Sequence, residues 1–286
     1  MFGFLNVYKP IGKTSHDVVA ILRRVLKIKQ IGHTGTLDPF AEGVLPICIG
    51  KSTRLIEYLE DDKEYIATVN FGKSTNTYDI EGEIVSQTGK IVTKKEILKC
   101  LENFKGEILQ TPPAFSAIKV KGKKLYEYAR AGLDVEIKPR MVYISKIELL
   151  DFDEEKQIAQ ILVACSKGTY IRSIANDLGV ITGAGAYLSK LVRTKAGKFT
   201  VDKSVPLDDL NSAGAVEKNL INPLDVIGLT VIKANDIERE KISHGLALNN
   251  RNFNNEKVVI FTYNDIIIAV GEVNKNKILI KKVFIS

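Results

Sequence analysis

The residues best suited to chemistry lie in one glycine-rich stretch at 32–43, which reads Gly-His-Thr-Gly-Thr-Leu-Asp-Pro-Phe-Ala-Glu-Gly. Its aspartate, Asp38, precedes Pro39, and a residue before proline is driven towards extended backbone, which limits where the carboxylate can point. The apolar segment 44–49 follows, so this acid would stand at the edge of a dry core, where a carboxylate must be paired, hydrogen-bonded or functional. Asp38 is therefore a candidate catalytic group, and an ordinary turn aspartate before proline is the alternative.

The other polar residues of this stretch suggest less. Glu42 lies four residues after Asp38, but the loop is not helical, so nothing places the two carboxylates on one face. His33 could act as a general base, a metal ligand or a contact to a base edge. The remaining histidines are His16 and His244, and this scatter argues against a histidine metal site. Two Gly-Lys-Ser-Thr tetrapeptides, at 50–53 and 72–75, lack the glycine that a phosphate-binding loop needs five residues earlier, which argues against an ATPase.

A second candidate is Arg172, in the segment 165–173, where an apolar strand runs through a glycine turn into a helix. The arginine would lie in the first helical turn, where its charge opposes the helix dipole. This placement favours an anionic partner, either Asp38 or an RNA phosphate, over the alternative of an ordinary surface cation.

The charge distribution suggests a polyanionic partner. The chain has 286 residues, a formal charge of +7 and a pI of about 9.1. Segment 117–146 holds eight basic and only three acidic residues. Tyrosines lie among these cations, and aromatic rings interleaved with cations suit unpaired bases beside a phosphate backbone. A solvated surface with core tyrosines is the alternative. The basic residues are Lys119, Lys121, Lys123, Lys124, Arg130, Lys138, Arg140 and Lys146.

The composition is that of a globular protein, with 45% hydrophobic and 26% charged residues. The three cysteines, Cys48, Cys100 and Cys165, lie far apart and are expected to be buried and reduced. Apolar runs are too short to span a bilayer, and no signal peptide is visible. We therefore expect a cytoplasmic protein. No helix shows an extended heptad, so we expect a monomer.

The elements that must position Asp38 and Arg172 can be predicted from local patterns. A strand at 2–8 precedes a helix capped by Thr14 or Ser15, and the loop at 32–43 leads into a buried strand at 44–49. Further strands are expected at 65–71, 83–85 and 158–165, and a helix at 94–103. The helix that begins near Ile171 can end at Gly179.

Beyond a boundary near 222–224 the pattern changes to short β segments at 257–263, 266–273 and 278–285. Turn residues at 264–265 and 274–276 separate them. About fifty residues of this kind predict a small barrel attached to a mixed α/β body.

Taken in order along the chain, five motifs resemble the TruB-type tRNA pseudouridine-55 synthase family, in its bacterial stand-alone branch. They are Lys9-Pro10-Ile11-Gly12-Lys13-Thr14-Ser15, the loop Gly32 to Pro39 with its continuation to Pro46, Thr111 to Lys119, Gly168 to Ser173, and Leu191-Val192-Arg193-Thr194. The resemblance implies an α+β fold with a mostly antiparallel central sheet flanked by helices. It also implies a synthase domain at 1–222 with an RNA-gripping insertion at about 110–146, and a PUA-like RNA-binding module at 229–286.

The resemblance implies an enzyme that isomerises uridine to pseudouridine in the T-loop of tRNA without metal or cofactor. The family match makes Asp38 catalytic, Tyr65 the residue that stacks on the target base, and Arg172 the partner of the aspartate. Leu191 would line the pocket and His33 would help hold the opened T-loop. Within the matched motifs, Tyr170 is expected to contact substrate. RNA contacts are expected from Lys9, Lys119, Lys121, Lys123, Lys124, Arg130 and Arg140.

The chain departs from the family pattern at Asn76, where an acidic residue is usual, and at the bulky Tyr78, and neither departure touches Asp38, Tyr65 or Arg172. Two alternatives remain beside the stand-alone enzyme. One is a guide-RNA-dependent synthase related to dyskerin, which usually carries N-terminal extensions and a fuller C-terminal module. The other is an RNA-binding tRNA folding chaperone, which the basic charge and the C-terminal module fit equally well.

Overall fold

The structure, a computed structural model, describes residues 1–251, 253 and 256–285. One large sheet is the centre of the first part of the chain. Its described strands run in the order β14-β1-β3-β12-β4-β11-β10-β7, and β2 pairs with β3 and β13 with β12. Neighbours are antiparallel except for β1 with β14 and β12 with β3. This mixed, mostly antiparallel sheet confirms the expected α+β fold. The strands are β1 (Gly3–Lys9), β2 (Ile31–His33), β3 (Glu42–Ile49), β4 (Lys63–Phe71), β7 (Gly106–Gln110), β10 (Arg140–Asp153), β11 (Ile158–Cys165), β12 (Ala186–Ala196), β13 (Phe199–Thr200) and β14 (Val205–Pro206).

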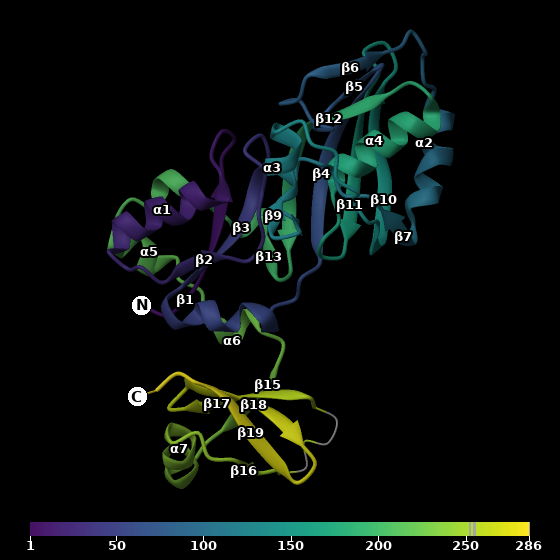
Figure 1. Cartoon of the computed structure of the whole chain (residues 1–286). Helices are drawn as coiled ribbons and strands as arrows, with labels where there is room; N and C mark the ends of the chain where they lie inside the picture. The colour runs from purple at the N-terminus through teal and green to yellow at the C-terminus, as the bar shows by residue number, and fades with distance from the viewer. Residues whose placement is uncertain (252, 254–255, 286) are drawn as a thin grey trace.

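Helices flank this sheet in two groups, with α1 and α5 beside the β1 half and α2 and α4 beside the β4 half (Figure 1). Polar caps fix where the first helices begin. Thr14 accepts from the backbone N–H of Asp17 while the Asp17 carboxylate reaches back, and Thr93 with Glu96 repeats this capping box at α2. The helices of this part are α1 (Ser15–Leu26), α2 (Lys94–Leu101), α4 (Ile171–Thr182), α5 (Ala213–Lys218) and α6 (Pro223–Val226), with 3-10 turns η1 (Gly50–Tyr58), η2 (Glu102–Phe104), η3 (Val201–Lys203) and η4 (Leu207–Asp209).

Helix α4 runs further than predicted. Gly179 lies inside it, and the helix ends at Thr182, where Gly183 takes the left-handed conformation with φ 70°. A Cβ on Gly179 would lie only 2.1 Å from the backbone nitrogen of Ala186. This glycine therefore allows close packing of α4 on the sheet, and the expectation that it ends the helix was wrong.

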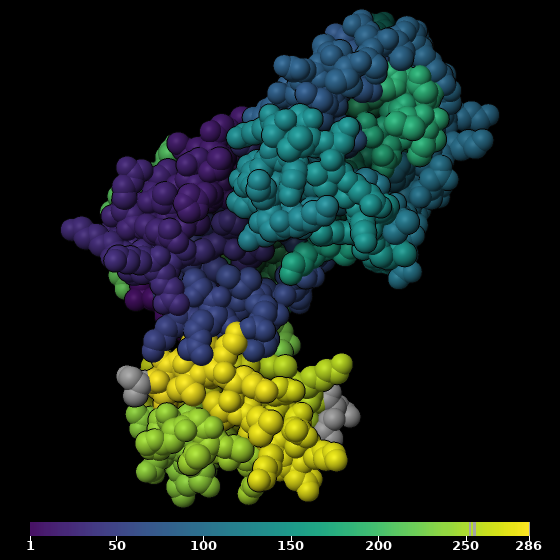
Figure 2. Space-filling view, in the orientation of Figure 1, coloured from purple at the N-terminus to yellow at the C-terminus, as the bar shows by residue number. Residues whose placement is uncertain are grey.

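Residues 111–139, between β7 and β10, cross the open face of the sheet instead of joining it and are called the crossing segment. It forms a two-residue hairpin, β8 (Lys119–Val120) with β9 (Lys123–Lys124), followed by α3 (Leu125–Arg130). In the space-filling view this teal segment lies between the N-terminal part and the rest of the large sheet (Figure 2). A separate two-stranded ribbon pairs β5 (Lys73–Thr75) with the exposed β6 (Ile84–Gln87).

The C-terminal module is a curled five-stranded sheet, β15-β17-β18-β19-β16, with one helix against it. Its strand pattern confirms the predicted β character of this region. The bounds are β15 (Thr230–Lys233), α7 (Asp236–Ser243), β16 (Leu248–Asn249), β17 (Val258–Tyr263), β18 (Ile266–Asn274) and β19 (Lys277–Val283). No helix within the described ranges is long and apolar enough to cross a membrane.

The module is attached through a shared apolar core. Phe284 and Ile260 from the module pack in one buried cluster with Phe4 and Leu55 of the large part. Polar contacts surround this cluster, because Arg54 donates to the carbonyl of Val283 at 2.8 Å and its guanidinium covers the Phe284 ring. The contact with η1 is visible at the upper edge of the module in Figure 2.

Candidate active site

A cleft of about 810 Å³ opens between the 32–43 loop, the ends of β4 and β12, the start of α4 and the crossing segment. This volume is in the range of small-molecule sites, roughly 300–1,000 Å³. The structure brings together in its lining six of the residues predicted from sequence, which are Asp38, Tyr65, Arg130, Tyr170, Arg172 and Leu191.

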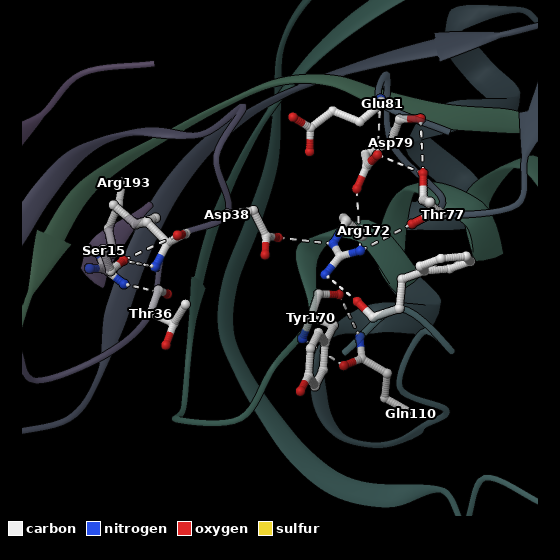
Figure 3. A network of polar contacts seen from close by, with 12 residues as sticks. Ser15, Thr36, Asp38, Thr77, Asp79, Glu81, Gln110, Tyr170, Arg172 and Arg193 are labelled. Atoms are coloured by element: carbon white, nitrogen blue, oxygen red, sulfur yellow. Dashed lines mark hydrogen bonds and ion pairs between the residues drawn. The ribbon is translucent and has the colours of Figure 1, made fainter. Parts of the chain in front are cut away.

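Arg172 is the centre of the polar network in this cleft (Figure 3). Its Nε lies 3.0 Å from Asp38 Oδ2, and its Nη1 lies 3.2 Å from Asp79 Oδ2. The remaining nitrogen donates to the carbonyl of Phe115 at 3.1 Å. The guanidinium is buried, and each of its three nitrogens contacts an acceptor of the protein. Arg172 therefore links the Asp38 loop, the Asp79 loop and the crossing segment.

Asp38 uses only one of its two carboxylate oxygens in this network. Oδ2 pairs with Arg172, whereas no hydrogen bond or ion pair from the described residues engages Oδ1. The side chain remains 35% exposed to the cleft. The ion pair holds the carboxylate in one orientation, while the second oxygen stays available to a bound molecule.

Asp79 is the second carboxylate that holds Arg172. It is buried, and it accepts hydrogen bonds from the hydroxyl of Thr77 at 2.6 Å and from the N–H of Glu81 at 3.0 Å. Burial raises the pKa of Asp79, while the Thr77 hydroxyl and the Arg172 charge act in the opposite direction. The chain reaches this position through Tyr78, which adopts a left-handed backbone with φ 66°. Asn76 accepts from the N–H of Glu83 at 3.0 Å and so helps to close the same loop.

The backbone before Asp38 is held by two residues from distant parts of the chain. The Ser15 hydroxyl contacts both backbone groups of Leu37, and the guanidinium of Arg193 donates to the carbonyls of Gly35 at 3.1 Å and Val44 at 2.6 Å. Figure 3 shows both residues on the side of Asp38 away from Arg172. These contacts fix the loop on which the carboxylate stands.

Lys9 was predicted to contact RNA, and this prediction is wrong because its side chain has no exposed surface. Its ammonium donates to the carbonyls of Pro10 at 2.9 Å and Lys13 at 2.6 Å, with a longer contact to Pro39 at 3.4 Å. Burial lowers the pKa of Lys9 to about 8, although the charge of Asp38 opposes this shift. Lys9 is thus an internal brace of the loop that carries Asp38.

The sheet supplies one wall of the cleft. Arg193 of β12 is paired in register with Tyr65 of β4, and Leu191 lies two residues earlier on the same face. Tyr65 is almost fully buried, and this burial raises its pKa, so its hydroxyl remains neutral at physiological pH. The ring and the Leu191 side chain give the cleft an apolar surface suited to a flat heterocycle.

Gln110 positions the residue before α4. Its amide accepts from the backbone N–H of Tyr170 at 2.8 Å and donates to the carbonyl of the same residue at 3.0 Å. Gln110 is buried, so this paired contact fixes the chain just before Arg172.

Several predicted residues lie outside the lining of this cleft. His33 belongs to β2, and its Nδ1 is buried without a hydrogen-bond partner among the described residues. Arg140 is exposed at the start of β10. Four lysines lie on or beside the β8–β9 hairpin and are mostly exposed, namely Lys119, Lys121, Lys123 and Lys124. Glu42 does not join Asp38, because it pairs with Lys190 at 3.1 Å.

Four functional positions were missed by sequence reasoning, which are Ser15, Asp79, Gln110 and Arg193. Asp79 had a usable signal, since a polar loop between two strands carries an aspartate two residues after a threonine. The other three act on backbone groups between 22 and 158 residues away in the chain, and no local pattern reports such a contact.

Two family models match successive parts of this chain. Residues 23–171 match the model described as TruB family pseudouridylate synthase (N terminal domain), and residues 172–227 match tRNA pseudouridylate synthase B C-terminal domain. The tRNA pseudouridine synthase B of Symbiobacterium thermophilum is 45% identical over 86% of this chain and 82% of its own. The tRNA pseudouridine synthase B of Caldanaerobacter subterraneus is 41% identical over 99% of both chains.

Among solved structures, the crystal structure of a Cbf5-Nop10-Gar1 complex aligns with a TM-score of 0.73 and 28% identity, over 99% of this chain and 85% of that one. An H/ACA RNP bound to a substrate RNA containing 2'-deoxyuridine aligns with a TM-score of 0.72 and 25% identity, over 100% and 86% of the two chains. The similarity thus extends over both the large sheet and the C-terminal module.

Proposed function

The chain belongs to the TruB family of pseudouridylate synthases, and on this premise we propose that it isomerises uridine to pseudouridine at position 55 in the T-loop of tRNA. The observation that carries this proposal is the Asp38–Arg172 ion pair of 3.0 Å beside an apolar wall formed by Tyr65 and Leu191. It presents one free carboxylate oxygen next to a surface that suits a pyrimidine ring.

The reaction breaks the bond from N1 of uracil to C1′ of the ribose and rejoins the base through C5. A proton leaves C5 and N1 gains one, so atoms and electrons balance without a redox partner or an energy source. One charged carboxylate meets the chemical need, either by attacking C1′ or by removing a proton from C2′. Asp38 Oδ1 would perform this step while Arg172 holds Oδ2.

The target uridine must leave its stack before Asp38 can reach its ribose. Tyr65 would stack on the displaced base and replace part of the lost stacking energy. Leu191 would close the apolar side of the pocket, and Tyr170 would contact the nucleotide from the start of α4. His33, on the strand that leads into the loop, would help to hold the opened T-loop.

The crossing segment and its flanks would grip the T-arm through phosphates. Cations on or beside the β8–β9 hairpin and α3 supply the charge. They are the exposed Lys119, Lys121, Lys123 and Arg130 and the half-buried Lys124, with the exposed Arg140 on β10. Such contacts release counterions, so affinity should fall steeply with salt. Lys9 is left out of this surface because it is buried.

We further propose two domains, a synthase domain at 1–222 with its insertion at about 110–146, and an RNA-binding module at 229–286, which includes the four positions outside the described residues. A separate curled sheet after α6 supports this division. The apolar cluster that joins Phe284 to Phe4 would keep the two in a fixed relation. The enzyme would act as a monomer in the cytoplasm.

A guide-RNA-dependent synthase is the second candidate, because solved structures of Cbf5 complexes share this fold at 25–28% identity. Relatives named tRNA pseudouridine synthase B are more similar, at 41–52% identity, which favours the stand-alone enzyme. Activity of the purified chain without guide RNA or partner proteins distinguishes the two.

The test uses purified protein and a T-arm RNA carrying tritium at C5 of uridine, since pseudouridine formation releases this label to water. We expect release by the wild-type chain, none from Asp38→Asn, and none when the target uridine is replaced by cytidine. Filter binding should give the same affinity for wild type and Asp38→Asn, because the substitution removes a charge without changing shape.

Turnover retained in Asp38→Asn would reject Asp38 as the catalytic group. Tight binding without release by the wild type would instead favour the guide-dependent enzyme or a tRNA folding chaperone. Adding guide RNA and partner proteins would then separate these two.

A further inference from the structure

The charges that line the cleft are divided between its two sides. Asp38 and Asp79 surround Arg172, as described above. Besides Arg130 of α3, three cations line the other side of the same cleft, namely Lys63, Lys167 and Arg193. Among the described residues, no carboxylate lies within ion-pair distance of Lys63 or Arg193, and Lys167 has only a loose contact of 3.8 Å with the exposed Asp61. Lys63 Nζ instead donates to the backbone carbonyl of Asp61 at 2.6 Å, so the groups that line this side of the cleft are mainly cationic.

Arg193 is the most unusual of the three because it is only 1% exposed and lacks a carboxylate partner. Its Nε and both Nη atoms donate to backbone carbonyls, which are those of Val44, Thr36 and Gly35. Carbonyl dipoles satisfy the hydrogen bonds but leave the net charge in place. A buried, uncompensated charge is costly unless an anion approaches it in the working state.

The three cations meet at one end of the sheet. Lys63 lies two residues before Tyr65 on β4, so both side chains are on the same face. Across the sheet Arg193 pairs with Tyr65, and Cys165, two residues before Lys167, pairs with Lys63. Burial lowers the pKa of Lys63, and the charge of Arg193 lowers it further, consistent with close mutual approach.

We propose that Lys63, Lys167 and Arg193 form a phosphate subsite that binds the RNA backbone phosphate next to the target uridine. The inference rests on the proposed function, because it takes Tyr65 as the residue that stacks on the base. Two residues of a strand span roughly 7 Å, which is the scale of one ribose between a base and its phosphate. Lys63 and Lys167 would contact the phosphate directly, and Arg193 would stabilise it from behind without touching it.

Such a subsite has a mechanistic consequence. With the base on Tyr65 and the phosphate on the lysines, the ribose would be held at both ends beside the loop that carries Asp38. The gap between the acidic side and the cationic side would then orient the sugar, so that C1′ and C2′ face Asp38 Oδ1. The subsite would thus contribute to positioning as well as to affinity.

The test compares T-arm RNAs that carry a neutral methylphosphonate in place of the phosphate on the 5′ or the 3′ side of the target uridine. Binding is measured for Asp38→Asn and for Asp38→Asn combined with Lys63→Gln or Lys167→Gln. The matched control is Lys105→Gln, an exposed lysine on the turn after α2. We expect each subsite variant to bind unmodified RNA about tenfold more weakly, as for a lost hydrogen bond to a charged group.

The decisive result is the response to the neutral linkage. With one of the two methylphosphonate RNAs, Lys63→Gln and Lys167→Gln should weaken binding by less than about twofold, because the neutral linkage has already removed the contact. Each variant should also reduce the slope of log affinity against log salt for unmodified RNA by about 0.7–0.9. An equal loss on charged and neutral linkages, or no loss on unmodified RNA, would overturn the subsite. Tritium release by the wild-type chain reports the proposed function separately, since the binding comparison does not depend on turnover.

Discussion

The Ser15 hydroxyl binds both backbone groups of Leu37, accepting from its N–H at 2.8 Å and donating to its carbonyl at 3.1 Å. A hydroxyl has one donor and two acceptor sites, so a single side chain can satisfy both. Ser15 is free to do this because Thr14, not Ser15, caps α1. Helix α1 is thereby connected to the residue that precedes Asp38.

We expect Ser15→Ala to lower turnover while leaving RNA affinity unchanged. Two buried backbone groups would lose their partner, at a cost of about 1–3 kcal/mol each if no water replaces it. The loop would then relax, and a small displacement of Asp38 should reduce single-turnover rates by roughly 10- to 100-fold. Single-turnover tritium release together with filter binding measures this split.

The control for Ser15→Ala is its neighbour, Thr14→Ala. This change removes the helix cap and should lower stability by about 1 kcal/mol, yet it leaves the contact with Leu37 in place. If both variants lose turnover equally, general destabilisation explains the effect and Ser15 has no special positioning role.

Asp79→Asn should slow the reaction without preventing substrate binding. The amide has the same shape as the carboxylate and can keep the hydrogen bond with Thr77, but it removes one of the two charges that hold Arg172. Arg172 would then orient Asp38 less firmly, so we expect a rate roughly 10- to 100-fold lower. Single-turnover rates at saturating RNA measure this effect.

Glu81→Gln is the matched control for Asp79→Asn. Glu81 also lines the cleft, but it is exposed, and no described residue forms an ion pair with its side chain. Comparable losses in both variants would mean that the overall negative charge of this side matters more than the contact between Asp79 and Arg172.

The sequence predicted several elements around the site because their signals are local, but it did not predict β12. Thr14 with Asp17 marks the start of α1, and alternating apolar residues mark β4 and β11. Asp38 and Arg172 could also be selected, since each lies in an unusual local context of glycines beside an apolar strand. Their contact at 3.0 Å followed from the family resemblance, because no spacing rule joins residues 134 positions apart.

The parts that sequence reasoning missed depend on the sheet order. Strand β12 inserts between β3 and β4, and only this order places Arg193 against Gly35 and Val44. The same limit explains the error at Lys9. A lysine in a basic chain suggests a surface contact, whereas burial of its ammonium depends on three carbonyls that the loop folds around it.

Gly179→Ala should destabilise the protein strongly, although alanine is the better helix former. The new Cβ would lie 2.1 Å from the nitrogen of Ala186 and 2.6 Å from the carbonyl carbon of Gly185, both of which are backbone atoms. Helix α4 must then move off the sheet, at a cost of about 1–3 kcal/mol or more. Urea denaturation measures the loss, and turnover should fall because α4 carries Arg172.

Gly214→Ala is the control for this substitution. Gly214 lies in α5, and no heavy atom lies within 4 Å of the position its Cβ would take. The change should raise stability by about 0.5–1 kcal/mol, as expected for alanine in an open helical position. A loss at Gly214 as large as that at Gly179 would show that close packing on Ala186 is not the cause.

Lys9 should make stability depend on pH in the alkaline range. The pKa of Lys9 is about 8 in the folded protein and 10.5 in the unfolded chain. Between these two pH values the unfolded chain therefore binds more protons than the folded one. Stability rises with pH wherever the unfolded state binds more protons. The stabilising contribution is therefore complete above pH 10.5 and is lost as the pH falls towards 8.

Replacing this lysine by methionine, Lys9→Met, removes the titrating group while keeping a long unbranched side chain. Urea denaturation measures the free energy of unfolding of the wild type and of Lys9→Met. The wild-type value should increase relative to the variant by about 1–2 kcal/mol between pH 8 and 10. The upper limit for one titrating group is about 1.4 kcal/mol per pH unit. The exposed variant Lys105→Met should show no such slope, because its lysine is solvated in both states. A difference between wild type and Lys9→Met that stays constant with pH would mean that the Lys9 ammonium remains fully protonated in the fold, stabilised by its carbonyl partners and by Asp38.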